Sequence, residues 1–162
     1  MPDAAPPMVH VLMVCLGNIC RSPTAEAVLR HKLHRAGLAA RVRVDSAGTG
    51  GWHVGEPPDP RSQRHAARRG YDLSMLRARR IAEEDFHLFD FVLAMDEDNL
   101  AELRRWQPAG ARAALGLFAD MPVPDPWAGG PEGFERVLDL AEAAADRWVA
   151  RLGAQLDGLR CG

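Results

Sequence analysis

Apolar residues in this chain fall into short continuous runs separated by stretches with helical spacing. The first run, residues 9–14, is rich in β-branched and other apolar side chains and contains one polar residue, His10. Such a run is typical of a strand that is buried on both faces of a parallel sheet. Further strands are predicted at 41–45, 89–95 and 113–118.

The intervening stretches predict helices. Residues 23–36 place apolar side chains three and four positions apart, and Gly37 ends this pattern. A short basic helix is expected at 61–69, with its arginines on a solvated face. A helix is also expected from about Glu97. The long helix predicted at 134–159 carries an apolar stripe that we assign to the core: Phe134, Leu138, Ala141, Ala145, Trp148, Leu152 and Leu156.

Strands and helices therefore alternate, which predicts an α/β fold with three α/β/α layers around a four-stranded parallel sheet. Right-handed strand–helix–strand connections bring the loops that follow the strands to the carboxyl edge of that sheet. Ligands of open α/β sheets bind at this edge. The length of 162 residues fits one domain, assigned to residues 8–160, after a lead-in at 1–7 that we expect to be disordered.

Composition restricts the classes of function. A hydrophobic content of 47% and a charged content of 26% are ordinary for a soluble globular protein, and no apolar run approaches the roughly 20 residues that span a bilayer. The net charge of −2 gives no general attraction to nucleic acid or to anionic membranes. The three cysteines are too few for a disulfide framework and are not spaced as a zinc site. We therefore expect a cytoplasmic protein without metal, cofactor, nucleic acid or membrane partner.

The strand at 9–14 runs directly into a short loop and then into a helix. Gly17 and Asn18 are residue types that tolerate left-handed backbone angles. Ser22 and Pro23 are predicted as the N-cap and the first residue of the helix. A tight loop at this position turns successive backbone N–H groups inward, which makes a binding site for an anion.

Cys15 opens this loop and Arg21 closes it. A guanidinium group can bind two phosphate oxygens at once. Partial positive charge around the sulfur favours thiolate over thiol. Because a thiolate beneath a bound oxyanion is an in-line nucleophile at phosphorus, the loop predicts phosphoryl transfer to cysteine.

With this Cys-x5-Arg-Ser loop near its N-terminus, the chain resembles the low-molecular-weight protein tyrosine phosphatases. The resemblance implies metal-independent hydrolysis of a phosphotyrosine-containing protein or a small aryl phosphate, through a phosphocysteine, with inorganic phosphate as product. It also implies a reversible disulfide between Cys15 and Cys20, although Cys20 could simply pack beneath the loop. We expect a monomer. The phosphate-binding loop is assigned to Leu16, Gly17, Asn18, Ile19, Cys20 and Ser22.

A proline- and glycine-rich segment at 121–133 reads as a loop late in the chain. The departing oxygen of a phosphate ester must be protonated, and a positioned carboxylic acid contributes about 10²–10⁴ in rate. Asp125-Pro126 is similar to the family's Asp-Pro-Tyr segment, which implies that Asp125 is the general acid; the alternative is a turn residue. Trp127 replaces the usual tyrosine, and Ala128 stands where a second tyrosine often follows.

Three further positions complete the expected site. The family resemblance assigns Ser46 to holding the phosphate loop. It places Asp96 behind the loop arginine, although Asp96 is also a plausible N-cap for the following helix and could do both. Trp52 is expected to stack on an aryl ring, in a pocket with Leu16 and Trp127, unless it covers the core.

Three other functions compete with this interpretation. Protein-arginine phosphatases resemble this fold but carry a threonine near the position of Ile19, and the apolar pair Leu16 and Ile19 favours aryl phosphates. Thioredoxin-coupled arsenate reductases use two further cysteines, whereas none lies between Cys20 and Cys161. A non-catalytic phosphotyrosine-binding module would require neither the nucleophile nor the acid.

Overall fold

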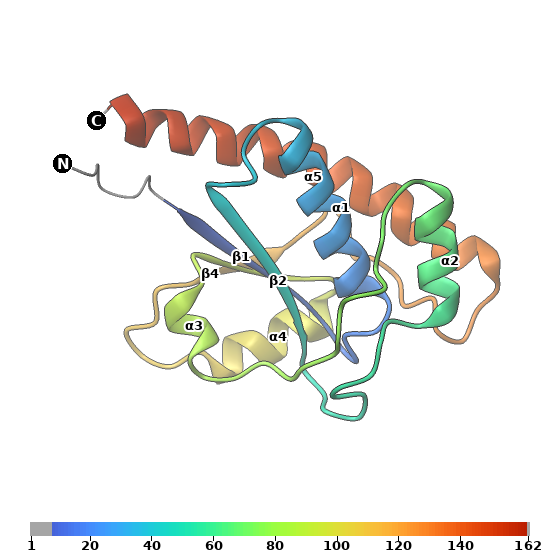
Figure 1. The fold of residues 1–162 in the computed structure, drawn as a ribbon. Coiled ribbons are helices and arrows are strands. Elements are labelled where there is room, and N and C mark those ends of the chain that lie inside the picture. Colours follow the sequence, from blue (N-terminus) through green and yellow to red (C-terminus); the bar gives the residue numbers. More distant parts are fainter. Residues whose placement is uncertain (1–7, 162) are drawn as a thin grey trace.

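The structure is a computed structural model that describes residues 8–161, so the lead-in predicted at 1–7 lies outside the described residues. The described strands form one parallel sheet in the order β2-β1-β3-β4 (Figure 1), which confirms the predicted α/β fold with its four-stranded parallel sheet. Within the described part of the chain, no helix combines the length and apolarity needed to cross a membrane. The elements in chain order are β1 (Val9–Cys15), α1 (Arg21–Arg35), β2 (Val42–Gly48), α2 (Pro60–Arg68), α3 (Asp85–Leu88), β3 (Phe91–Ala94), α4 (Glu97–Trp106), β4 (Ala114–Leu117) and α5 (Pro131–Cys161).

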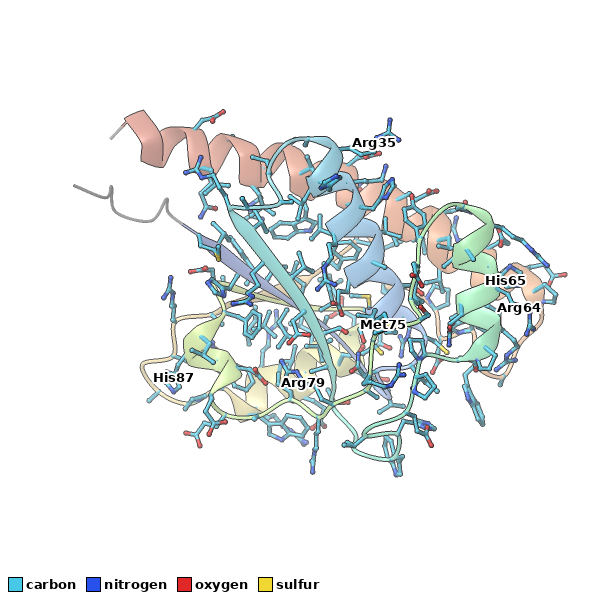
Figure 2. The ribbon with its side chains drawn as sticks, viewed as in Figure 1. Arg35, Arg64, His65, Met75, Arg79 and His87 are labelled. Carbon is cyan, nitrogen blue, oxygen red and sulfur yellow. The ribbon has the colours of Figure 1, made fainter. Side chains whose placement is uncertain are left out.

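The central strand β1 is buried on both faces, as its continuous apolar sequence predicts. Val11 and Met13 belong to a core layer shared with α1 and α5, whereas Leu12 and Val14 belong to one shared with α3 and α4. All four side chains are 0% exposed. Burying a side chain of this size stabilises the fold by roughly 1.5–3 kcal/mol, so both faces of the sheet contribute to holding β1 in place. Side chains fill both layers in Figure 2.

Two predicted boundaries are wrong at the carboxyl edge of the sheet. Strand β2 continues through Ser46 to Gly48, because these residues keep pairing with the end of β1. Helix α1 begins at Arg21 with Cys20 in the N-cap position and without a side-chain cap, so Ser22 is not the N-cap. The Ser22 hydroxyl lies beside the Cys15 sulfur instead.

The basic helix predicted at 61–69 is present as α2, and Arg64 and Arg68 are exposed as expected, but the prediction of a solvated face is wrong for Arg69 and His65. Arg69, just beyond α2, forms ion pairs with Glu135, Asp139 and Glu142 of α5 at 2.6, 3.0 and 2.7 Å. His65 stacks on Phe134 and contacts Glu135. Because the carboxylates follow each other along one face of α5, His65 and Arg69 attach α2 and its end to that helix.

The carboxyl ends of the strands bring the predicted site residues to one edge. The backbone N–H groups of Thr49 and Gly50 donate to the carbonyl oxygens of Cys15 and Leu16, each at 2.9 Å, so the loop after β2 is joined to the loop after β1. A Cβ atom at Gly48 would lie 2.7 Å from the Leu16 carbonyl oxygen, so this approach requires glycine.

Candidate active site

The loop after β1 folds around the Cys15 side chain. Cys15 is 3% exposed, and its Sγ lies 3.0 Å from Ser22 Oγ. The backbone N–H of Asn18 donates to the same sulfur at 3.3 Å. Asn18 has a φ of +58°, the left-handed conformation expected from its residue type. The sulfur thus accepts from the Asn18 backbone and lies within hydrogen-bond distance of the Ser22 hydroxyl.

Arg21 is buried beside this sulfur and fixed by several acceptors. Its Nη1 donates to Asp96 Oδ2 at 2.6 Å and to the Val123 carbonyl oxygen at 3.0 Å, and its Nη2 lies 3.7 Å from Asp125 Oδ2. Burial alone would lower the pKa of Arg21, but the facing Cys15 and Asp96 outweigh it and raise that pKa. The site therefore retains a fixed positive charge.

Asp96 both pairs with the loop arginine and caps the following helix, the two contacts that the sequence suggested. One carboxylate oxygen accepts from Arg21 Nη1, and the other accepts from the backbone N–H of Asn99 at 2.7 Å as the N-cap of α4. The side chain is 26% exposed. Because α4 begins at this residue, its N-terminal turn fixes the carboxylate that holds the arginine.

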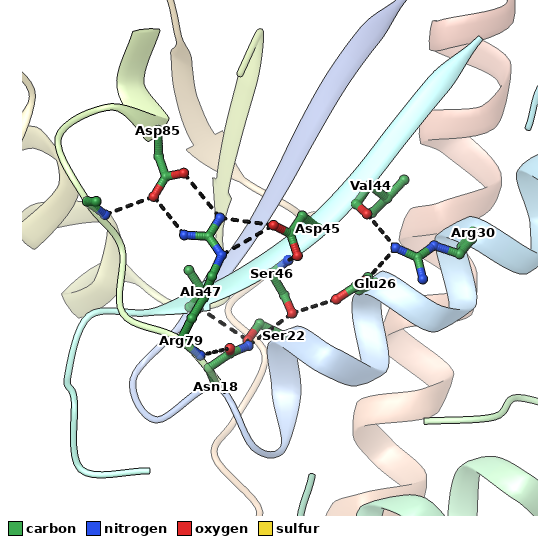
Figure 3. A network of polar contacts seen from close by, with 11 residues as sticks. Asn18, Ser22, Glu26, Arg30, Val44, Asp45, Ser46, Ala47, Arg79 and Asp85 are labelled. Carbon is green, nitrogen blue, oxygen red and sulfur yellow. Dashed lines mark hydrogen bonds and ion pairs between the residues drawn. The ribbon is translucent and has the colours of Figure 1, made fainter. Parts of the chain in front are cut away.

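A network of side chains supports the loop from behind (Figure 3). Asn18 Nδ2 donates to Ser22 Oγ at 2.7 Å and to Ser46 Oγ at 3.0 Å. The backbone N–H of Arg79 donates to Asn18 Oδ1 at 2.9 Å, which fixes the amide orientation. Ser46 in turn donates its hydroxyl to Glu26 Oε1 at 2.6 Å. Since Ser22 accepts from the amide, its own proton can point toward the Cys15 sulfur at 3.0 Å or toward the Ala47 carbonyl oxygen at 3.5 Å.

Arg79 itself is anchored on both sides. It lies on the connection between α2 and α3 (Figure 2), and its guanidinium pairs with Asp45 of β2 at 3.0 Å and with Asp85 of α3 at 2.9 Å. Burial would lower the pKa of Arg79, but these two carboxylates raise it. The backbone N–H that orients Asn18 is therefore held by a charged cluster.

A pocket of about 190 Å³ opens above the loop. Trp52 and Trp127 form exposed walls, 71% and 56% accessible, so Trp52 does not cover the core. A Cβ atom at Gly50 would come within 1.9 Å of the Trp52 ring, so the ring position depends on that glycine. The remaining predicted residues Asn18, Ser22, Ser46 and Asp96 lie behind the pocket wall. The pocket is lined by Cys15, Leu16, Gly17, Ile19, Cys20, Arg21, Trp52, His53, Asp125 and Trp127.

Asp125 reaches this pocket from the loop before α5. Its Oδ1 accepts from the backbone N–H of Trp127 at 3.0 Å, and the Trp127 carbonyl oxygen accepts from Arg61 Nη2 at 2.9 Å. Arg61 is held by Asp59 at 2.9 Å and lies 4.7 Å from the centre of the Phe134 ring. Although burial raises the pKa of Asp59, hydrogen bonds from Arg61 lower it overall. The carboxylate is thus positioned by a short chain of contacts to α2.

Comparison with known proteins identifies the family. The family model described as low molecular weight phosphotyrosine protein phosphatase matches residues 10–157. The chain belongs to this family. It is therefore a protein-tyrosine phosphatase, a phosphoric monoester hydrolase, as the Cys15–Arg21 loop predicts.

Individual relatives cover nearly the whole phosphatase. A low molecular weight protein-tyrosine-phosphatase of Streptomyces coelicolor is 43% identical over 159 residues, which is 92% of this chain and 96% of that protein. A crystal structure of a protein tyrosine phosphatase from Entamoeba histolytica has a TM-score of 0.87 at 36% identity, covering 91% of this chain and 98% of that one. A Drosophila arginine phosphatase has a TM-score of 0.83 at 31% identity, covering 88% and 96%.

Besides Arg79 with its two carboxylates, sequence reasoning missed Glu26 and Arg30 behind the phosphatase loop. Glu26 is 2% exposed, and burial raises its pKa, opposed by hydrogen bonds from Ser46 and by Arg30. Arg30 Nη2 donates to Glu26 Oε2 and to the Val44 carbonyl oxygen, each at 2.6 Å. The four-residue spacing of this pair along α1 was the available signal.

His53 is a further residue of the phosphatase site that the sequence did not reveal. It lines the pocket, and its Nδ1 lies 2.6 Å from Glu56 Oε2. A Cβ atom at Gly17 would approach the imidazole to 3.1 Å, so the ring closes over the loop. Its place next to Trp52 was the only sequence hint.

Cys20 lines the pocket but is 4% exposed. Burial raises the pKa of its thiol to about 12, so Cys20 is a neutral thiol near neutral pH. Both Cys15 and Cys20 are free thiols. Among residues 8–161, no cluster of three or more His, Cys, Asp or Glu side chains could hold a metal ion.

Proposed function

We propose that the phosphatase hydrolyses phosphotyrosine with Cys15 as nucleophile, Arg21 as phosphate-binding cation and Asp125 as general acid and base. The observation that carries this proposal is the convergence of two separate chain segments, the loop 15–21 and the loop that contains Asp125, on one pocket. Cys15 and Asp125 line it with Arg21 between them, and Arg21 Nη2 lies 3.7 Å from the Asp125 carboxylate.

In the first step the Cys15 thiolate attacks phosphorus opposite the phenolic oxygen. The sulfur–phosphorus bond forms as the phosphorus–oxygen bond breaks, and Asp125 transfers its proton to the departing oxygen. Backbone N–H groups of the loop from Leu16 to Arg21 and the Arg21 guanidinium hold the other phosphate oxygens, where charge is spread in the transition state.

In the second step water attacks the phosphocysteine. Asp125, now a carboxylate, takes a proton from the water while the sulfur–phosphorus bond breaks and inorganic phosphate forms. The leaving Cys15 sulfur accepts a hydrogen bond from Ser22, whose hydroxyl lies at 3.0 Å. Asn18 supports this direction because its amide N–H group already donates to the Ser22 oxygen.

The pocket walls favour an aryl phosphate over a phosphoarginine. Trp52 and Trp127 offer ring faces to a phenyl group, and Leu16 and Ile19 add apolar surface. Ile19 has no side-chain acceptor for the N–H groups of a phosphorylated guanidinium. We therefore retain phosphotyrosine as the substrate, although a structural neighbour is an arginine phosphatase.

The finer properties are also proposals. We propose a monomer that acts in the cytoplasm without metal, cofactor, nucleic acid or membrane, supported by the net charge of −2 and the small number of cysteines. Sedimentation analysis with a mass of one chain, and full activity in a chelator, would support the monomeric and metal-independent parts. A dimer mass or loss of activity in the chelator would contradict them.

We also propose that Cys20 protects the nucleophile from over-oxidation. Peroxide converts the Cys15 thiolate to a sulfenic acid, and the Cys20 thiol displaces water from it to form a disulfide. Activity lost in peroxide should return with dithiothreitol in the unmodified phosphatase and stay lost in Cys20→Ser. Equal recovery in both proteins would refute the role.

The catalytic assignment is tested with 4-nitrophenyl phosphate in the presence of a chelator. Cys15→Ser should abolish phosphate release, and Asp125→Asn should slow it by about 10²–10⁴. The matched control is Asp120→Asn, which changes an exposed carboxylate before the same loop, 3.3 Å from Arg147. Activity that survives in Cys15→Ser, or an Asp125→Asn rate equal to that of the control, would overturn the assignment.

A further inference from the structure

A groove of about 620 Å³ adjoins the active-site pocket. Most of its lining residues come from the loop that follows β2 and from helix α4, and Figure 1 shows these two elements. Leu16 and Trp52 line both the groove and the pocket, so the two adjoin at these side chains. A small aryl phosphate fills only the pocket, whereas a phosphotyrosine peptide extends beyond it, and this groove adjoins the pocket. The catalytic steps described above do not use the groove.

Arg80 is the positioned cation of this groove. Its Nε lies 3.3 Å from the Thr49 carbonyl oxygen, and its guanidinium carbon lies 5.8 Å from the centre of the Trp106 ring. Its aliphatic stem passes Gly51, where an added Cβ atom would meet it at 3.6 Å. These contacts orient the guanidinium without neutralising it, and no carboxylate of residues 8–161 pairs with it within 4.0 Å.

The two carboxylates of the groove already have stabilising partners within α4. Glu102 accepts from Arg105 through both carboxylate oxygens, at 2.6 and 2.7 Å. Asp98 lies in the first turn of α4, where the helix N-terminus stabilises a carboxylate. Asn99 lines the groove, is 3% exposed, and has a side-chain oxygen without a hydrogen-bond partner among the described residues. Because the Asn99 oxygen is buried, Arg80 is the group with unused capacity for a ligand.

We propose that this groove binds the residues that flank phosphotyrosine in a peptide or protein substrate, with an acidic side chain paired to Arg80. The inference rests on the proposed function of the neighbouring pocket and adds a substrate class to it. The walls formed by Trp52 and Trp106 accept the apolar parts of the same segment. The phosphatase thus selects acidic phosphotyrosine segments.

The test uses phosphotyrosine peptides in which a single Glu, Ala or Lys is moved through the positions on either side. At low ionic strength, kcat/KM for the Glu peptide should exceed that for the Lys peptide by about two- to five-fold at one or more positions, the range of an exposed ion pair. The ratio should approach one as salt is added. Arg80→Glu should invert it.

The matched control is Arg43→Glu. Arg43 is exposed near the amino end of β2, whereas the site lies at the carboxyl end of that strand. The substitution makes the same change in net charge. It should leave the Glu-to-Lys ratio unchanged. A general loss of activity in Arg80→Glu, caused by a loosened Thr49 contact, cancels from this ratio because it affects both peptides equally.

Failure of the groove and failure of the pocket give different results. If the unmodified protein does not hydrolyse 4-nitrophenyl phosphate, the proposed function itself fails. If it does, and the Glu-to-Lys ratio is the same in the unmodified protein and in Arg80→Glu, the groove proposal is overturned. A preference for Lys in the unmodified protein would also overturn it, since Asp98 would then be the recognising charge.

Discussion

Replacing Ser22 by alanine removes the side-chain hydroxyl that lies 3.0 Å from the Cys15 sulfur. The same oxygen accepts from Asn18 Nδ2 at 2.7 Å, so the variant also leaves a buried amide donor with one acceptor fewer. A hydrogen bond to a charged group contributes about 1.5–3 kcal/mol, which corresponds to roughly 10- to 150-fold in rate at 1.4 kcal/mol per tenfold. This stabilisation acts when the sulfur carries negative charge.

The effect should be largest where the thiolate leaves phosphorus. Ser22→Ala should therefore accumulate phosphoenzyme, seen as a burst of 4-nitrophenolate followed by a steady state slowed about 10- to 150-fold. Ser46→Ala is the matched comparison, because Ser46 is one hydrogen bond further from the sulfur and should give a smaller loss. A Ser22→Ala steady-state rate within two-fold of the unmodified rate, or a larger loss in Ser46→Ala, would refute this role.

Three further predictions follow from the same contacts. Burial raises the pKa of Cys20 from 9.0 to about 12, so the contribution of its neutral thiol to stability is complete below pH 9 and is lost as pH rises toward 12. The free energy of unfolding, measured with urea, should therefore fall less steeply between pH 9 and 12 in Cys20→Ala than in the unmodified protein. The same pH dependence in both proteins would contradict this. Burial raises the pKa of Glu26, so the contribution of this carboxyl group to stability is lost as pH rises above the ordinary 4.5. The free energy of unfolding of Glu26→Gln, relative to that of the unmodified protein, should therefore increase from pH 4 to 7. A difference that stays constant over this range would contradict this. Arg61→Ala removes the hydrogen bond to the Trp127 carbonyl oxygen and so loosens the segment that positions Asp125. Because an alkoxide is a poorer leaving group than an aryloxide and depends more on this acid, hydrolysis of alkyl phosphates should slow more than hydrolysis of aryl phosphates. An equal loss for both would point to a general structural effect.

The nucleophile loop was predictable because its determinants are local. Cys15 to Arg21 lie on one loop between a buried strand and a helix, and Asn18 is of a type that adopts the observed φ of +58°. The Ser22 N-cap was wrongly predicted for a related reason. A serine at the start of a helix commonly accepts a hydrogen bond from a backbone N–H group of the first turn. Here the Ser22 hydroxyl contacts the Cys15 sulfur and the Asn18 amide instead.

The rest of the site depends on contacts between distant segments. The ion pairs of Arg69 require α5 to lie beside α2. The hydrogen bond from Arg61 to the Trp127 carbonyl oxygen joins residues 66 positions apart. Glu26 supports Ser46 only after β2 has been placed next to α1. A charge run alone does not reveal such partners, which is why the basic helix at 61–69 was interpreted as solvated. The short helix α3 has too few residues to show a period.

The most direct test of the mechanism is to find the covalent intermediate. Asp125→Asn should slow the hydrolysis of the phosphocysteine, so acid quenching during turnover of 4-nitrophenyl phosphate should trap it. Mass spectrometry of the digested protein should then show one phosphoryl group on Cys15, absent from the same sample of Cys15→Ser. A phosphoryl group on another residue, such as His53, or complete turnover with no trapped phosphoenzyme in any quenched sample, would contradict nucleophilic catalysis by Cys15.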